Sequence, residues 1–427
     1  MSVTLNQSPS RLIGFRDPAV YVLYDSANYS LNKFRYLVEL SVYDGSTWTA
    51  VALLKRYPNN SNAAVFDVAN ILKAQQRDLD APLGPASTEL FAVSNSAVRY
   101  RIQYGYESST GPDTAPATTW QATESAVHYA IDARYLGLQH TIASGGIQSN
   151  YILDATDKGM LSLQGNEYRV SDTEKGSFSF ISDDAISSDP SIFYIQFFNG
   201  STGLGAAVPV TVSARGGVDP GVTDLNSVVQ IAYLTPFYLE AQATASLKPS
   251  TYPTWTHYEV YAYGGGIIRS EVIKFVRDND CKPYTPLRFM WKNRLGGWDQ
   301  MYSTGKTRKK SAVKRTQLAH DRGNWFSAQG ASSFEYSTQV SSVITELTRE
   351  ETYTLQFQPK DAGERRLVES LVEARHAFAW LYNADEATDE TYYPIVILTN
   401  TVESLSSEND KVKTVSIEFR MANERAI

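Results

Sequence analysis

A strict alternation of apolar and polar side chains in residues 98–107, VRYRIQYGYE, constrains the fold of this chain most. One face of this stretch carries Val98, Tyr100, Ile102, Tyr104 and Tyr106, and the other carries Arg99, Arg101, Gln103 and Glu107. A period of two residues is that of a β-strand with one face in water. Strand-like segments of this kind recur along the chain, at residues 34–43, 192–198, 257–263, 353–357 and 411–421.

Short strands separated by turn residues predict a mainly β fold of sandwich-like or barrel-like modules. The composition agrees, since the 427 residues include 27 Tyr, 17 Phe and 7 Trp, and aromatic residues favour sheets. Tyrosine is also common where protein surfaces meet. We expect an N-terminal β-domain at 1–110, a central β-rich domain at 111–280, a β-hairpin with a basic loop at 281–345, and a small α+β domain at 346–427.

Two segments support these boundaries. Residues 108–119, SSTGPDTAPATT, are small, polar and rich in Pro and Gly, which is typical of a loop or linker. After residue 360 the pattern becomes helical: Asp361 and Glu364 have the spacing of a capping box, and apolar residues between 367 and 372 form one stripe. A strand before this helix and three after it predict one helix on a sheet.

Several functional classes are disfavoured by composition. The formal net charge of −7 argues against general nucleic-acid binding. Cys281 is the single cysteine, so neither an intrachain disulfide nor a cysteine zinc cluster can form, and the five histidines lie far apart. The first residues, MSVTLNQSPSRLIGF, do not resemble a secretory signal, and no apolar run approaches the ~18 residues that span a bilayer. We expect a protein made in a cytoplasm, without cofactor, metal or membrane insertion.

The chain also lacks a recognisable catalytic motif, and we predict that it is not an enzyme. It contains no P-loop, no GxGxxG opening a helix and no GxSxG elbow. Asp183 and Asp184 sit in a polar turn; a glycosidase pair and a calcium ligand set are the alternatives to a solvated loop. Cys281 would act as a nucleophile only if folding brought a histidine close, and an inert cysteine is the competing interpretation.

The most distinctive block is residues 283–302, PYTPLRFMWKNRLGGWDQMY, which predicts a hairpin around a glycine turn. Its Trp291 and Trp298 are interpreted as core or subunit-interface residues, with a ligand-binding loop as the alternative. A basic run follows, for which contact with phosphates is one reading. We favour a solvated loop, or one that pairs with an acidic neighbouring subunit. The candidate interface residues of this run are Lys306, Arg308, Lys309, Lys310, Lys314 and Arg315.

Three blocks of the sequence together resemble a known group of proteins. They are residues 17–21 with 34–36, 57–58 and 65–68; residues 287–299; and residues 369–382 with 394–397 and 412–421. In this order they are similar to virion structural proteins of tailed bacteriophages from aquatic and gut bacteria. Residues 110–280 carry no such similarity.

The resemblance implies a tail or baseplate component located in the virion, made in the host cytoplasm and assembled as a ring or trimer with other virion proteins. It implies no catalytic residue. One alternative is a receptor- or carbohydrate-binding adhesin that contacts a host surface glycan, for which aromatic residues within 120–280 would be the place to look. A second is a head-to-tail connector component.

Overall fold

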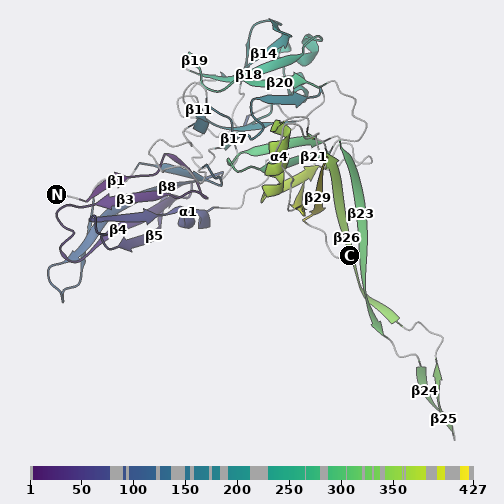
Figure 1. Ribbon diagram of the computed structural model, residues 1–427, viewed down its shortest axis with the longest axis horizontal. Helices are drawn as coiled ribbons and strands as arrows, with labels where there is room; N and C mark the ends of the chain where they lie inside the picture. The colour runs from purple at the N-terminus through teal and green to yellow at the C-terminus, as the bar shows by residue number, and fades with distance from the viewer. Residues whose placement is uncertain are drawn as a thin grey trace. The chain divides into compact units, whose positions relative to one another are not determined.

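The computed structural model describes most of the chain (Figure 1). The described residues are 3–76, 90–92, 96–121, 126–135, 150–153, 158–172, 176–182, 191–211, 229–264, 266–278, 287–303, 305–319, 323–328, 331–336, 342–357, 359, 362–380, 392–399 and 414–422. The fold is mainly β, with several separate sheets, which confirms the predicted class. Two compact units can be distinguished: unit 1 comprises residues 1–281, 290–302 and 361–375, and unit 2 comprises residues 282–289, 303–360 and 376–427.

The N-terminal part of unit 1 contains two sheets that share one core. Their strand orders are β1-β3-β6 and β2-β10-β8-β4-β5, with β9 paired to β8. The strands are β1 Thr4–Gln7, β2 Leu12–Gly14, β3 Val20–Tyr24, β4 Asn32–Tyr43, β5 Trp48–Arg56, β6 Ala63–Asp67, β8 Ala97–Ser109, β9 Ala117–Trp120 and β10 His128–Ile131. Tyr21 and Phe66 from the first sheet and Tyr36 and Tyr100 from the second are all fully buried in this core. The arrangement is a β-sandwich.

Two further sheets of unit 1 share a second core. Their orders are β11-β13-β17-β7 and β12-β20-β18-β14-β15, with β16 on β14 and β19 on β18. The strands are β7 Leu90–Ala92, β11 Ile152–Leu153, β12 Glu167–Val170, β13 Phe178–Ser182, β14 Ser191–Asn199, β15 Thr202–Gly203, β16 Val208–Thr211, β17 Val229–Ala232, β18 His257–Gly264, β19 Ile267–Ile268 and β20 Ile273–Arg277. Phe178 and Phe180 of β13 contact Phe193 of β14 at ring-centroid distances of 5.5 and 5.0 Å.

Unit 2 is built on a seven-stranded sheet, to which unit 1 residues also contribute. The order is β22-β21-β27-β28-β29-β26-β23, and β21 from Met290 onward and most of β22 are counted with unit 1. The strands are β21 Leu287–Lys292, β22 Trp298–Ser303, β23 Lys306–Ala319, β26 Ser342–Phe357, β27 Ala377–Trp380, β28 Tyr393–Ile397 and β29 Val415–Met421. A separate two-stranded sheet joins β24 Gly323–Ala328 to β25 Ala331–Tyr336.

Helices are short and few among the described residues. They are α1 Ala69–Ala74, α3 Pro236–Glu240, α4 Ala362–Glu373 and the 3-10 turns η2 Ala245–Leu247 and η3 Pro249–Thr251. In α4 the predicted apolar stripe is present, because Leu367, Val368 and Leu371 are buried. Asp361, the proposed capping residue, lies outside the described residues.

The boundary predicted at residue 110 does not coincide with a boundary between sheets. Strand β7 pairs with β17 in the second sandwich, whereas β9 and β10 belong to the first. The presumed linker at 108–119 is the end of β8, a turn and the start of β9, so it is a hairpin within one sheet. Pairing between strands some 140 residues apart leaves no local signal in the sequence.

Candidate functional site

The basic run lies on a long strand, and the expectation of a loop at residues 306–315 was wrong. Strand β23 pairs antiparallel with β26 from Lys306 opposite Gln356 to Ala319 opposite Ser342. A high density of charged residues is typical of a solvated loop. On a strand, however, alternate side chains point to opposite faces, so each face carries only part of the charge. This places the six predicted interface residues on two faces: Lys306, Arg308, Lys310 and Lys314 on one, and Lys309 and Arg315 on the other.

Most of this strand pair extends beyond the sheet. Strand β29 pairs with β26 only from Tyr353 to Phe357. From Lys310 opposite Thr352 outward, β23 and β26 pair only with each other among the described strands. We call residues 310–319 and 342–352 the ribbon; at ~3.4 Å per residue it is roughly 33 Å long. Figure 1 shows these strands side by side, continuing toward the β24–β25 hairpin.

One face of the strand pair neutralises its own charge. Lys309 Nζ lies 2.6 Å from Glu351 Oε2, and Arg349 Nη2 lies 2.6 Å from Glu351 Oε1. The hydrogen bond from Lys309 lowers the pKa of the Glu351 carboxyl, and the same bond raises the pKa of Lys309. Lys309 Nζ also lies 5.6 Å from the ring centroid of Tyr353. Toward the sheet this face becomes the core, where Leu355 is fully buried.

The other face keeps an excess of positive charge. Within the part of the chain that the structure describes, Lys306, Arg308 and Lys310 have no carboxylate within 4.0 Å. Lys314 Nζ lies 3.9 Å from Glu350 Oε2, and Arg420 Nη1 of β29 lies 3.3 Å from Glu350 Oε1. We call this the basic face. Such exposed pairs contribute little to stability, so the charges are available for binding.

Trp291 and Trp298 are core residues, and the interface role considered for them is wrong. Both are buried, with 0% and 1% of their surface exposed. The Trp291 indole Nε1 donates to Ser370 Oγ of α4 at 3.0 Å, and the Trp298 backbone N donates to Ser179 Oγ of β13 at 2.8 Å. A surface of another chain therefore cannot reach them without unfolding this region.

The turn between β21 and β22 is held by both sandwiches of unit 1. From the first, Arg134 N donates to Arg294 O at 2.7 Å, and Tyr135 OH donates to Leu295 O at 2.9 Å. Toward the second, Asn293 Nδ2 donates to Leu161 O at 2.7 Å. The turn within residues 283–302 therefore joins parts of unit 1, and its backbone and side-chain groups are bonded to the sandwiches and not arranged as a ligand-binding loop.

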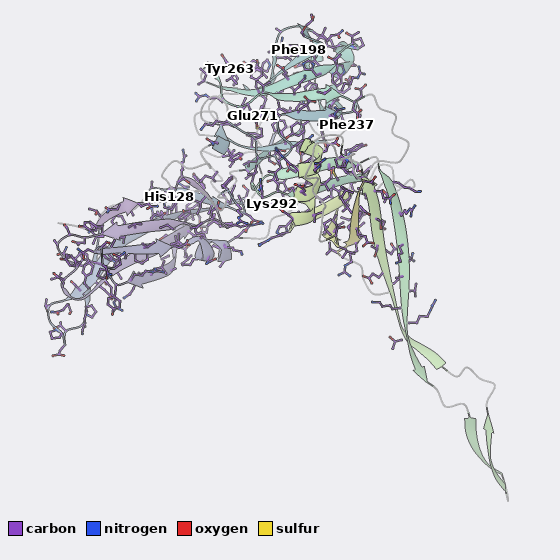
Figure 2. All side chains as sticks on the ribbon, viewed as in Figure 1. His128, Phe198, Phe237, Tyr263, Glu271 and Lys292 are labelled. Atoms are coloured by element: carbon purple, nitrogen blue, oxygen red, sulfur yellow. The ribbon has the colours of Figure 1, made fainter. Side chains whose placement is uncertain are left out.

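The junction also contains buried charged residues, which the sequence patterns did not predict. Lys292 Nζ lies 3.9 Å from Asp132 Oδ2, and Arg16 Nε lies 3.3 Å from Asp132 Oδ1. Figure 2 labels Lys292. Burial lowers the pKa of Lys292 to about 8, although Asp132 opposes the shift. Burial likewise raises the pKa of Asp299 to about 6, despite the Leu163 N–H that it accepts at 3.4 Å. A charged residue inside an apolar strand was the available signal.

A second buried titratable group lies in the first sandwich. The ring of His128 stacks on Tyr100 at a centroid distance of 5.5 Å and meets Tyr21 edge-on at 6.0 Å. Its Nδ1 lies 3.1 Å from Ser10 O. Burial lowers the pKa of His128, so the neutral ring is the form that this core favours. Its neighbours are aromatic rings and backbone, which indicates a packing role.

The outer face of β14 and β18 carries partly exposed aromatic side chains. Tyr194 lies opposite Tyr261 in register, with ring centroids 5.9 Å apart, and meets Tyr263 edge-on at 5.1 Å. Phe198 stacks on His257 at 5.0 Å; Figure 2 labels Tyr263 and Phe198. Gln196 and Glu259 add polar groups between the rings. This aromatic face lies within residues 120–280, the part of the chain in which the adhesin alternative places its glycan-binding aromatic residues.

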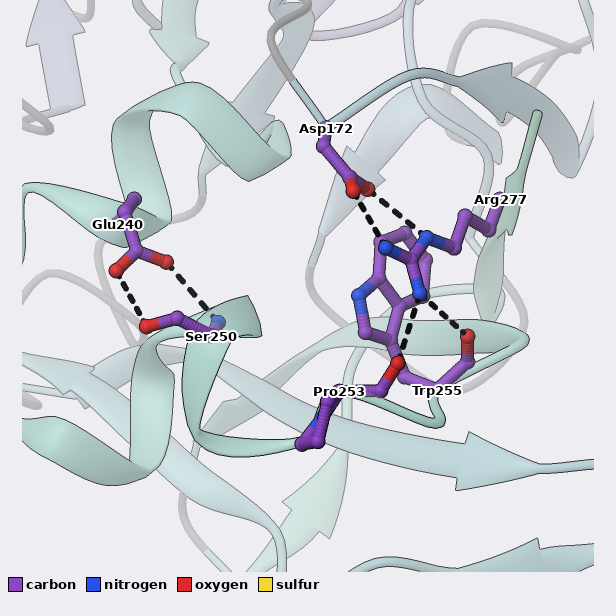
Figure 3. A network of polar contacts seen from close by, with 6 residues as sticks. All are labelled: Asp172, Glu240, Ser250, Pro253, Trp255 and Arg277. Atoms are coloured by element: carbon purple, nitrogen blue, oxygen red, sulfur yellow. Dashed lines mark hydrogen bonds and ion pairs between the residues drawn. The ribbon is translucent and has the colours of Figure 1, made fainter. Parts of the chain in front are cut away.

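Figure 3 shows a polar network at the end of β20 in the same sandwich. The guanidinium of Arg277 binds Asp172 through two bonds, of 3.0 Å at Nε and 2.5 Å at Nη2. Its Nη1 donates to Pro253 O at 3.0 Å, and its centre lies 4.9 Å from the Trp255 ring. The network fixes the segment before β18 against the end of β20. The Arg277 guanidinium uses these contacts to join parts of the same sandwich, so the network has a structural role.

The alternatives that involve a metal ion or a reactive cysteine gain no support from the described residues. They contain no cluster of three or more His, Cys, Asp or Glu side chains arranged to hold a metal ion. Asp183, Asp184 and Cys281 lie outside the described residues. Within the same described part of the chain, no helix has the length and apolar character to cross a membrane.

Comparison with known proteins adds no family. No family model matches the chain, and no curated protein matches it. A solved structure of Salmonella alpha-2-macroglobulin (mutant Y1175G) aligns with 84% of this chain at 7% identity and a TM-score of 0.19, and the chain spans 16% of that protein. The FN1–FN3 domains of chicken CNTN1 align with 98% of this chain and 97% of theirs, at 10% identity and a TM-score of 0.16.

Proposed function

We propose that this chain is a structural assembly protein, a tail or baseplate component of a phage particle, which uses the ribbon to hold a neighbouring subunit. The single observation that carries the assembly role is the extension of β23 and β26 beyond Tyr353, where no third described strand supports them. The resemblance of residues 17–68, 287–299 and 369–421 to virion proteins is what suggests a phage particle.

The energetics of the ribbon favour a partner. An isolated two-stranded hairpin is marginally stable at best in water, and ordering each residue costs about 1–2 kcal/mol of backbone entropy. Residues 310–316 of the ribbon are all exposed, so they bury little apolar surface to offset this cost. Docking on another subunit would supply the missing burial, as interfaces in closed rings do repeatedly.

The test is the mass of the purified protein by light scattering over a concentration series. A shortened variant replaces residues 311–351 by Asn-Gly, which joins the paired residues Lys310 and Thr352 through a two-residue turn. A matched control replaces residues 109–116, the β8–β9 turn, by Asn-Gly, which joins the paired residues Ser108 and Ala117 in the same way. We expect a discrete oligomer for the full chain and the control. The shortened variant should be a folded monomer whose circular dichroism loses only the contribution of the removed strands. A full chain that is monomeric at every concentration would contradict self-assembly.

The aromatic face supports a second candidate function, a receptor- or carbohydrate-binding adhesin. Tyr194, Tyr261 and Tyr263 present apolar rings with polar tips, which suits both sugar and protein partners. Glycan-array binding that is lost in the variant Tyr194→Ala/Tyr261→Ala, with the oligomer intact, would favour this function. For the connector alternative, the ring would have to lie at the capsid vertex, which electron microscopy of a particle would locate.

A further inference from the structure

The two faces of the β23–β26 pair differ in how their charges are satisfied. On one face Lys309 and Arg349 share Glu351. On the basic face, strands β23, β26 and β29 together carry five basic residues against three acidic ones among the described residues, Glu346, Glu350 and Glu418. The five are Lys306, Arg308, Lys310, Lys314 and Arg420. The excess of positive charge therefore lies on the basic face.

The geometry of the basic face forms a row. Lys306, Arg308 and Lys310 are alternate residues of one strand, so their Cα atoms follow each other at about 7 Å. Thr352, Thr354 and Gln356 lie opposite Lys310, Arg308 and Lys306 in register and give the face a polar, uncharged flank. A row of cations beside hydroxyl and amide groups suits a surface that offers several carboxylates.

The basic face suits a docking partner better than the free edge of the sheet does. Strand β23 is the last in the sheet order, so one of its edges has no neighbour among the described strands. Six of its residues from 306 to 316 are Lys or Arg, and charged side chains along an edge oppose the addition of another strand. Face-on docking is compatible with the same lysines.

The distribution of charge along the chain favours one occupant of the basic face. Residues 306–357 contain eight basic and five acidic side chains, while the remaining residues contain 31 basic and 41 acidic ones. The strand pair with its tip is therefore positive, and the rest of the same chain carries a net charge of −10. We infer that the basic face docks on an acidic surface of a second copy of this chain, in a head-to-tail contact. This inference rests on the proposed assembly function.

A head-to-tail contact uses different surfaces on the two copies, so it generates rings or filaments according to the rotation between copies. Complementary charge sets register and speeds encounter more than it adds affinity. Because the contact is between exposed charges, salt must weaken it.

The experiment measures self-association by analytical ultracentrifugation at about 50, 150 and 500 mM salt, a range over which screening changes severalfold. The test variant is Lys306→Glu/Arg308→Glu/Lys310→Glu. The matched control, Lys73→Glu/Arg366→Glu/Arg375→Glu, makes the same change in net charge at exposed positions of unit 1. We expect the unmodified chain and the control to associate at least ten-fold more weakly at the highest salt. The test variant should associate at least ten-fold more weakly than the control at 150 mM and show little salt dependence.

Equal association of the test variant and the control would overturn the inference. If the variant shortened at 311–351 nevertheless fails to associate, the assembly proposal stands and only the basic face is excluded; if it associates normally, both fail. A chain that stays monomeric but binds double-stranded DNA, with binding lost in the test variant, would also overturn the inference by making phosphate the partner.

Discussion

The indole Nε1 of Trp291 and the hydroxyl of Ser370 are joined by a buried hydrogen bond of 3.0 Å, which links β21 to α4 across 79 residues of sequence. Both groups are buried, so neither has water as a substitute partner. The bond positions the helix over the strand that precedes the glycine turn. Its removal therefore tests whether α4 is held by specific polar contact or only by its apolar stripe.

Ser370→Ala should lower the free energy of unfolding by about 1–3 kcal/mol, because it leaves a buried indole N–H without an acceptor. Chemical denaturation measures this directly. Ser416→Ala, at an exposed position of β29, serves as the control and should change stability by no more than about 0.5 kcal/mol. Adding Trp291→Phe to Ser370→Ala should cost less than the sum of the two single changes; strict additivity would argue against the bond.

Gly297→Ala should destabilise the junction strongly. A Cβ at this position would lie 2.2 Å from the carbonyl oxygen of Leu161 and 2.6 Å from its Cβ, and backbone cannot move aside cheaply. We expect a loss of about 3 kcal/mol or more. Gly111→Ala is the matched control, since its Cβ would meet only Thr114 Oγ1 at 3.4 Å. Equal melting temperatures for the two variants would refute this packing argument.

Acidification should destabilise the first sandwich through His128. Its pKa is lowered in the folded state by burial, so below the ordinary value of about 6.5 the unfolded chain binds more protons than the folded one. Stability is therefore lost as the pH falls through that value. Urea titrations between about pH 7.5 and 5 should show this loss for the unmodified chain and a smaller loss for His128→Phe, which retains a ring against Tyr100. Parallel pH profiles would rule out His128 as the cause.

Lys292 should make the stability of the protein depend on pH in the alkaline range. With a folded pKa of about 8 and an unfolded value near 10.4, the unfolded chain binds more protons between these values, so stability should rise as the pH increases from about 8 to 10. In Lys292→Met this rise should disappear. At neutral pH the substitution should be neutral or stabilising by up to a few kcal/mol, because Asp132 keeps Arg16. A large loss at pH 7 would show that the ion pair itself holds the junction.

Local patterns in the sequence predicted much of the fold. The alternation at 98–107 is β8, in which Tyr100 and Ile102 are fully buried, and the stripe after residue 366 is α4. These features depend on neighbours a few residues apart, which a sequence displays. Pairings such as that of β7 with β17 depend on how distant segments pack together in the folded chain, so local sequence patterns could not predict them.

The candidate site was harder to predict, for the same reason. Whether Lys309 is solvated or paired depends on Glu351, 42 residues later, and no local pattern joins them. The tryptophans of the central block were correctly seen as important, but their aromatic character suits core and interface equally. Only the burial of Trp291 and Trp298 decides between these roles.

The strand order of the large sheet has a consequence for biosynthesis. Strand β29 is translated after every other strand of this sheet, yet it lies between β28 and β26. On the ribosome, β26 can pair with β23 early. Strands β26 and β28 are connected only through β29, so the sheet between them cannot form until β29 has left the exit tunnel. The nascent chain therefore carries an open sheet until β29 has emerged, and a stop anywhere before residue 415 would remove a central strand and not a peripheral one.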